Sequence, residues 1–343
     1  MSKFKFSVGP WNVHEGADAF GPDIRASIPF DYKLKKFKEI GFSGIQFHDD
    51  DVVTDMNDLT EEQIKSRAGE LKDYLDDLKL EAEFVAPRLW LDPRTADGGF
   101  TSNSASDREF ALWRAYRSID IAKQLGTDRI VLWLAREGTL CAESKDPVES
   151  IDKLRQAIDA MLAYDPSIKI LIEPKPNEPI DRSFIPTVGH VLGFANSTSD
   201  PSRVGALLES AHAVLAGLDP AFEMGYCLVH QKLWGVHLND QNSIRYDQDK
   251  SFGVENIRSA FNQIKVLTDH QYGSNGEFVG LDVKAMRTQS LEKSFQHLEN
   301  SLKIVKLLEE KVARLDTSRV NKYREMRNYE ALEMYIMELL LGE

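Results

Sequence analysis

Cysteine is scarce in this chain, with only two among 343 residues. Cys141 and Cys227 are far apart and neither lies in a CxxC motif. A disulfide scaffold is therefore excluded, and a reducing, cytoplasmic location is the simplest expectation. Long hydrophobic runs are also missing, because no stretch reaches the about 18 apolar residues that a membrane-spanning helix needs. The first residues alternate polar and apolar side chains, so we expect no secretory signal peptide.

Positively charged residues are fewer than negatively charged ones. The chain has 42 lysines and arginines against 55 aspartates and glutamates, which gives a formal net charge of -13. A surface of this charge repels phosphate backbones and anionic lipid headgroups, so we expect neither a nucleic acid nor a membrane as a partner. Hydrophobic residues make up 42% of the chain, which suffices for a core and excludes global disorder.

Short runs rich in β-branched and aromatic residues alternate with longer amphipathic stretches. Eight strands are expected at Lys3–Gly9, Gly41–His48, Leu80–Ala86, Arg129–Ala135, Ile168–Lys175, Arg203–Glu209, Leu233–Asn239 and Glu277–Lys284. Helices are expected at Tyr32–Ile40, Glu61–Leu78, Asp107–Leu125, Pro147–Ala163, Ile185–Ala195, Pro220–Gln231, Val254–Thr268 and Leu291–Leu308. These repeats predict an α/β fold, a (β/α)8 TIM barrel over residues 1–313. A doubly wound sheet is the alternative, because the spatial order of the strands cannot be read from the pattern.

Residues 314–343 follow the eight repeats and are predicted to form a C-terminal helical extension. One side of this extension is apolar and comprises Met326, Tyr329, Leu332, Ile336, Leu339 and Leu340. A barrel is already complete without it. Two interpretations are open: the extension covers the underside of the barrel, or, as we favour, it contacts a neighbouring subunit.

Ionisable residues gather where the predicted strands end, and in TIM barrels these ends form the active-site mouth. The candidates there are His48, Asp51, Glu173, Lys175, Glu209, His212, His237, Asp247, Asp249 and Asp282. Carboxylates packed this closely repel one another, and a cation resolves that conflict. The ligand types suit Mg, Mn or Co, and their number exceeds one coordination sphere, so we expect two divalent metal ions. Asp49 and Asp50 are more typical of helix caps or surface groups.

The segment Glu173-Pro-Lys-Pro-Asn-Glu-Pro179 resembles the xylose isomerase family, and the resemblance runs from about Phe6 to about Arg287. His48-Asp-Asp-Asp51 and Tyr246-Asp-Gln-Asp249 follow that family's pattern in order. The resemblance implies an aldose–ketose isomerase that acts on xylose or a related sugar by a metal-assisted hydride shift. It also implies a homotetramer or a homodimer.

The resemblance further implies a role for each matching residue. One metal ion would be held by Glu173, Glu209, His237 and Asp282. The other would be held by Glu209, His212, Asp247 and Asp249. Lys175 would polarise the carbonyl region of the sugar, and His48, oriented by Asp51, would assist ring opening. Trp11 and Trp133 match the family's apolar walls, and Phe20 matches an aromatic residue that reaches into the site of the neighbouring subunit.

His237 departs from the family pattern. The family has an aspartate ligand where Gly235-Val-His-Leu-Asn239 carries this histidine. Because nitrogen is a softer donor than oxygen, the change favours Mn, Co or softer metals over Mg. Ketose 3-epimerases, which are single-metal relatives, also place a histidine here among three carboxylates, and they abstract a proton. A single-metal epimerase or lyase is therefore the alternative, and a non-catalytic homologue that binds metal and sugar is a third possibility.

The loop after the third predicted strand is a second departure. It reads Ala86-Pro-Arg-Leu-Trp90, where the family has small polar residues. Trp90 offers a larger ring to the substrate pocket. Arg88 either meets a substrate carboxylate or phosphate, or forms a salt bridge with one of the many nearby acids.

Overall fold

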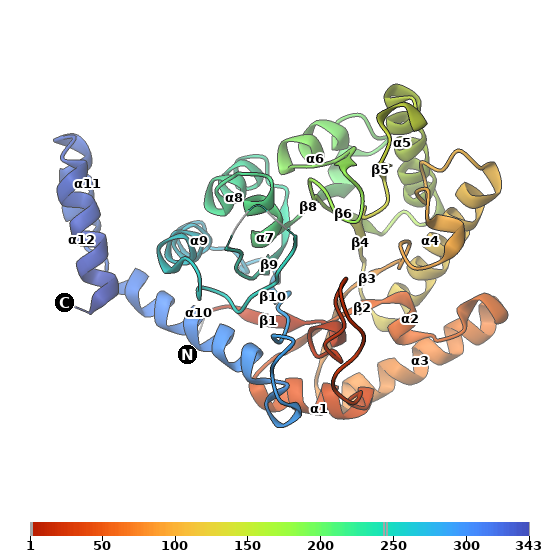
Figure 1. Ribbon diagram of the computed structural model, residues 1–343, viewed down its shortest axis with the longest axis horizontal. Coiled ribbons are helices and arrows are strands. Elements are labelled where there is room, and N and C mark those ends of the chain that lie inside the picture. The colour runs from red at the N-terminus through yellow and green to blue at the C-terminus, as the bar shows by residue number, and fades with distance from the viewer. Residues whose placement is uncertain (1–2, 243, 245, 343) are drawn as a thin grey trace.

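Eight parallel strands close into a barrel in the computed structural model, which describes residues 3–242, 244 and 246–342. Around the barrel the strand order is β1-β10-β9-β8-β6-β4-β3-β2 (Figure 1). The strands are β1 (Lys5–Val8), β2 (Gly44–His48), β3 (Glu81–Ala86), β4 (Arg129–Trp133), β6 (Lys169–Glu173), β8 (Val204–Glu209), β9 (Leu233–Leu238) and β10 (Phe278–Leu281). Each lies inside a predicted range, so the TIM barrel prediction is confirmed. The closure of the sheet excludes the doubly wound alternative.

The predicted helices also form, with ends shifted by a few residues. They are α1 (Phe30–Ile40), α3 (Glu61–Leu78), α4 (Ala105–Leu125), α5 (Pro147–Tyr164), α6 (Val188–Ala195), α8 (Pro220–Val229), α9 (Ile257–Asp269) and α10 (Gln296–Arg314). The short elements that were not expected include α2 (Asp49–Val52), α7 (Ser210–Leu215) and the antiparallel pair β5 (Gly138–Thr139) and β7 (Arg182–Ser183). Within the described ranges, every helix is too short or too polar to cross a membrane.

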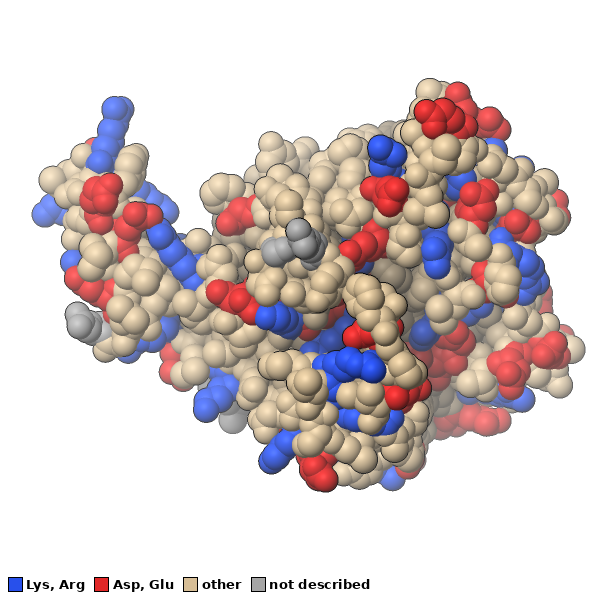
Figure 2. All heavy atoms as spheres, viewed as in Figure 1, with Lys and Arg blue, Asp and Glu red and all other residues tan. Residues whose placement is uncertain are grey.

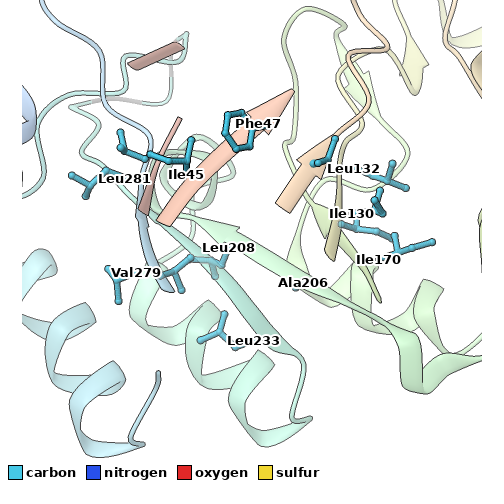
Figure 3. Packing of buried hydrophobic residues seen from close by; sticks show 14 of the residues in the cluster. Ile45, Phe47, Ile130, Leu132, Ile170, Ala206, Leu208, Leu233, Val279 and Leu281 are labelled. Atoms are coloured by element: carbon cyan, nitrogen blue, oxygen red, sulfur yellow. The ribbon is translucent and has the colours of Figure 1, made fainter. Parts of the chain in front are cut away.

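The alternation of side chains along each strand separates two hydrophobic layers. In β6, Ile170 and Ile172 belong to the large cluster between strands and helices, part of which Figure 3 shows. Leu171, between them, packs with Phe84 and Val131 in a second cluster. Because successive residues of a strand point to opposite faces, Glu173 shares the face of Leu171. The last residue of β6 therefore points to the barrel axis at its carboxyl end.

The C-terminal extension consists of α11 (Thr317–Glu325) and α12 (Tyr329–Leu341). Lys311 in α10 donates to the Leu339 carbonyl at 2.6 Å, and Arg258 in α9 pairs with Glu333 at 2.7 Å. Figure 1 shows both helices beside the barrel, at one end of its longest axis. This position favours a subunit contact over a cover for the underside. The contact itself stays a prediction, and Glu343 lies outside the described residues.

Candidate active site

A cavity of ≈ 290 Å³ opens at the carboxyl ends of the strands. Its apolar side comprises Trp11, Phe84, Ala86, Trp90, Val131 and Trp133. Its ionisable side comprises His48, Arg88, Glu173, Lys175, Glu209, His212, His237, Asp247, Asp249, Asp282 and Lys284. Acidic and basic side chains are intermixed over the face of the molecule that Figure 2 shows. The candidate residues from different strands thus meet in one cavity.

Two predicted site residues do not line this cavity. Asp51 lies behind His48, where its Oδ2 atom accepts a hydrogen bond from the His48 backbone N–H at 2.9 Å. Phe20 stands in a loop with 90% of its surface exposed. Its expected role in the site of a neighbouring subunit stays a prediction.

Four ligand-type residues converge on one point, and we call them the four-ligand set: Glu173, Glu209, His237 and Asp282. One donor atom from each lies within 4.8 Å of all the others. The Nδ1 atom of His237 is 3.3 Å from Glu173 Oε1, 3.6 Å from Glu209 Oε2 and 3.8 Å from Asp282 Oδ2. These residues come from the neighbouring strands β6, β8 and β9 and from the end of β10, in barrel order.

Among the described residues the four-ligand set forms ion pairs only with its own histidine and His212, while the charge of Lys284 acts on Asp282 from farther away and opposes the rise of its pKa. No lysine or arginine in the described part of the chain forms an ion pair with Glu173, Glu209 or Asp282. Burial raises the pKa of Glu209 and of Asp282, because a buried carboxylate loses its hydration. Burial opposes charging of His237, but the Glu173 carboxylate outweighs it and raises the pKa of His237 well above its ordinary value.

A second group shares Glu209 with the first, and we call Glu209, His212 and Asp247 the three-ligand set. Here the chain supplies a cation of its own, because Lys175 Nζ donates to Asp247 Oδ2 at 2.9 Å. Burial opposes ionisation of Asp247, but His212 and Lys175 hold its pKa well below the ordinary value. Asp249, the further ligand expected here, lies outside this set and pairs with Lys284.

The end of β2 is held by two arginines. Arg114 in α4 forms two contacts of 2.7 Å with the buried Asp49, so the expectation of a surface role for Asp49 is wrong, although Asp49 does begin α2 and accepts the Asp50 backbone N–H at 2.9 Å. Arg88 lies 2.8 Å from Asp50 Oδ1 and 3.2 Å from Asp51 Oδ1. Its Nη2 atom is also 2.6 Å from His48 Nδ1. Of the two alternatives for Arg88, the structure therefore shows the salt bridge with nearby acids.

The three tryptophans form an aromatic wall in which the ring of His48 lies between Trp11 and Trp90. The ring of Trp11 lies 4.3 Å from that of His48, and Trp90 packs edge-on against Trp133 at 4.5 Å. Trp11 Nε1 also donates to Asp282 Oδ1 at 3.0 Å. An apolar wall of this size limits the access of water to the ionisable side of the cavity.

Sequence reasoning missed several residues of the site. Asn239 Nδ2 donates to Glu209 Oε1 and to Asp249 Oδ1, each at 2.9 Å, and so holds a shared ligand in place. Its position two residues after His237 puts it on the same face of the chain, and this was an available signal. Arg114 carried no local signal, because its partner Asp49 is 65 residues away in sequence.

Comparison with known proteins agrees with the barrel fold. A family model described as xylose isomerase-like TIM barrel matches residues 34–298. An L-ribulose 3-epimerase superposes with a TM-score of 0.66 at 15% identity, over 91% of this chain and 96% of its own. A D-psicose 3-epimerase from Clostridium cellulolyticum H10 gives 0.64 at 12% identity, over 89% and 99%. A xylose isomerase domain protein from Alicyclobacillus acidocaldarius gives 0.60 at 14%, over 89% and 99%. At identities this low, the likeness to these structures shows the fold alone.

Proposed function

This chain belongs to the xylose isomerase-like TIM barrel family, and on that premise we propose that it is a metal-dependent sugar epimerase. It would abstract a proton from the carbon next to a carbonyl group. The observation that carries the proposal is the four-ligand set, which gathers three carboxylates and one imidazole without a lysine or arginine partner among the described residues. The epimerases of the same fold support this alternative over the hydride-shift isomerase.

The donor set fits a divalent cation. Glu173, Glu209, His237 and Asp282 would hold it, since three carboxylates and an imidazole suit a hard to borderline metal. The imidazole favours Mn or Co over Mg. When bound, the ion supplies Lewis-acid polarisation of the sugar oxygens and stabilises developing negative charge there.

The order of the strands places two carboxylates at opposite ends of the four-ligand set, and we call them the outer carboxylates. Glu173 in β6 and Asp282 after β10 stand at the two ends of the four-ligand set, with Glu209 and His237 between them. We assign one of the outer carboxylates as the base that removes the proton from the sugar carbon, and the other as the acid that returns a proton to the opposite face. One C–H bond breaks and another forms, so configuration changes without oxidation or reduction.

Lys175 and the tryptophan wall complete this chemistry. The ammonium group of Lys175 lies 5.3 Å from the centre of the Trp133 ring, at the border of the apolar and ionisable sides. There it can donate a hydrogen bond to a sugar oxygen that gains negative charge. The wall keeps bulk water from the reacting carbon.

The aldose–ketose isomerase is the second candidate, and the three-ligand set favours it. Asp247 Oδ1 and His212 Nδ1 are buried polar atoms without a hydrogen-bond partner among the described residues. A second divalent ion at this set would supply the pair of cations that a hydride shift between neighbouring carbons requires. The ion pair of Lys175 with Asp247 opposes this, since it already neutralises one of the ligands.

Solvent deuterium separates the two candidates. The purified protein would be incubated in D2O with Mn, Co or Mg and, in turn, L-ribulose, D-psicose, D-tagatose, D-fructose and D-xylose. An epimerase gives an epimeric ketose that carries deuterium at the inverted carbon, because the abstracted proton exchanges with solvent. An aldose–ketose pair without deuterium would support the isomerase. Metal binding without turnover on any of these sugars would support the non-catalytic homologue.

We also propose that residues 314–343 contact a second copy of the chain. Tyr329, Met334 and Leu341 in α12 are more than half exposed in the single chain, which leaves apolar surface uncovered. Sedimentation of the full chain, compared with a chain ending at residue 313, would test this. A monomeric full chain would contradict the proposal.

A further inference from the structure

Arg88 and His48 meet at a contact that the family resemblance does not explain. The Nη2 atom of Arg88 lies 2.6 Å from Nδ1 of His48, at the rim of the cavity. We infer that Arg88 is a positioning residue that fixes the imidazole of His48 with its hydrogen on Nε2. His48 then faces the cavity as a hydrogen-bond donor.

The chemistry of the two side chains decides which atom donates. A guanidinium carries five N–H donors and no acceptor, and it keeps its protons in proteins. At 2.6 Å the Nδ1 atom of His48 must therefore accept the hydrogen bond from Arg88, and it carries no hydrogen itself. In a neutral imidazole the single N–H then resides on Nε2.

Asp51 is the competing partner of the same nitrogen. Its Oδ2 atom is 3.2 Å from His48 Nδ1, and a hydrogen bond there would require the hydrogen on Nδ1. That oxygen already accepts the His48 backbone N–H at 2.9 Å, and Asp51 Oδ1 lies 3.2 Å from Arg88 Nη2. Of the two contacts with Nδ1, that of Arg88 is the shorter, and the guanidinium can act only as a donor. Arg88 thus takes the place at His48 that Asp51 was expected to fill.

The imidazole is held in this orientation from both sides. The ring of Trp11 lies 4.3 Å from it, and that of Trp90 lies 5.1 Å from it at an interplanar angle of 76°. Within the described residues no side chain or backbone group forms a hydrogen bond with Nε2, and the side chain of His48 lines the cavity. The hydrogen on Nε2 is therefore available to a ligand.

The consequence concerns the substrate, and this step rests on the proposed function. A donor at Nε2 recognises a sugar oxygen that accepts, such as a carbonyl or ring oxygen. It cannot take the proton of an anomeric hydroxyl, which the ring-opening role implied by the family resemblance requires. His48 would accordingly hold the sugar in place and would not act as a base.

Nitrogen-15 NMR of the full chain labelled at histidine tests the tautomer directly. The shifts and ring couplings of the two nitrogens report which one carries the hydrogen, and His48→Gln identifies the signals of His48 among the eight histidines. We expect hydrogen on Nε2 and none on Nδ1. Hydrogen on Nδ1, or on both nitrogens, at neutral pH would overturn the inference. This measurement requires no turnover, so it stands even if the proposed epimerase activity fails.

Variants of Arg88 show whether this residue causes the tautomer. In Arg88→Met, Asp51 becomes the nearest partner of Nδ1, and we expect the hydrogen to move there. Arg88→Lys retains a donor and should restore hydrogen on Nε2. Arg94→Met is the matched control, because Arg94 makes a comparable ion pair with Asp92 at 2.7 Å on the same loop. A tautomer unchanged in folded Arg88→Met would refute the role of Arg88.

Kinetics give a second test once a substrate is known. We expect Arg88→Met to raise KM on the order of tenfold, the size of one hydrogen bond to substrate, with a smaller change in kcat. Arg88→Lys should recover most of this loss. A loss confined to kcat would contradict the binding role of His48 and leave the NMR result to decide the tautomer.

Discussion

The two ligand sets at the mouth of the barrel share Glu209 but differ in how their charge is balanced. Lys175 pairs with Asp247 of the three-ligand set at 2.9 Å, whereas the four-ligand set has no lysine or arginine ion pair among the described residues. In the three-ligand set, Asp247 is compensated by a lysine of the chain itself. The three carboxylates of the four-ligand set repel one another more strongly, and a bound cation would relieve that repulsion. This difference is why we propose the four-ligand set as the metal site.

The largest expected effect follows removal of an outer carboxylate from the four-ligand set. In Glu173→Gln and Asp282→Asn the side-chain shape stays but the acid–base group and one anionic ligand are lost. We expect turnover to fall by about 10²–10⁴-fold. Initial rates and Mn titration by calorimetry would measure both losses.

Asp247→Asn in the three-ligand set is the control for that comparison. Because Lys175 already compensates Asp247, this variant should keep one Mn per chain. If Asp247→Asn abolishes Mn binding as completely as Glu173→Gln does, the assignment of the metal is wrong.

The next largest effect concerns the stability of the fold in acid. It allows acid unfolding to be distinguished from loss of metal. His297 is buried outside both sets, and its Nε2 atom lies 2.8 Å from the Asn12 carbonyl oxygen. Burial, with His14 and Arg25 acting in the same direction, lowers the pKa of His297 to about 4 from 6.5. The unfolded chain binds this proton below 6.5 and the folded chain does not until about 4. Stability is therefore fully present above pH 6.5 and falls between 6.5 and 4, by about 3 kcal/mol.

Chemical denaturation across this pH range would measure the slope. His297→Gln removes the titrating group, so its free energy of unfolding should vary less with pH between 4 and 6.5 than that of the natural chain. An equal slope in the two proteins would contradict the assignment to His297. In the variant, any remaining loss of metal in acid reports on the ligand sets themselves.

A third prediction removes the cation that distinguishes the sets. Lys175→Met leaves Asp247 without its ammonium partner, so the three-ligand set becomes more like the four-ligand set. We expect a second Mn to bind roughly 10–100-fold more tightly than in the natural chain, because a competing positive charge is removed a few ångströms from the ligands. Equilibrium dialysis with elemental analysis would count the ions. Lys284→Met is the comparison, because the ion pair that it removes is with Asp249, outside the three-ligand set, while its charge acts on Asp247 only from farther away. If the number of Mn ions bound per chain is the same in Lys175→Met as in the natural chain, Lys175 is not what distinguishes the two sets.

The barrel was predictable because each strand is a short apolar run, such as Ile168–Lys175, that ends in polar residues. The candidate ligands followed from the same logic, since Glu173 and Glu209 end their strands and His237 lies near the end of its own. What the sequence could not supply were contacts between side chains far apart in the chain. The Arg114–Asp49 pair spans 65 residues and follows no local period. The partner of Arg88 was undecidable for the same reason, since a substrate carboxylate or phosphate and a nearby acidic side chain all suit a guanidinium.

The smallest expected effect comes from Asn239, which supports the one ligand that both sets share. Its Nδ2 atom donates to Glu209 Oε1 at 2.9 Å and to Asp249 Oδ1 at 2.9 Å. Asn239→Leu removes this donor while leaving every ligand in the chain, so Glu209 loses orientation but keeps its charge. We expect Mn affinity to fall by about tenfold, the lower end of what loss of a partner behind a ligand costs. Because Glu209 belongs to both sets, the second Mn of the Lys175→Met, Asn239→Leu double variant should weaken by a similar factor. If the affinity falls for only one of the two Mn ions, Glu209 binds metal in a single set. The comparison of the two sets would then lose its basis, because it assumes that they share this ligand.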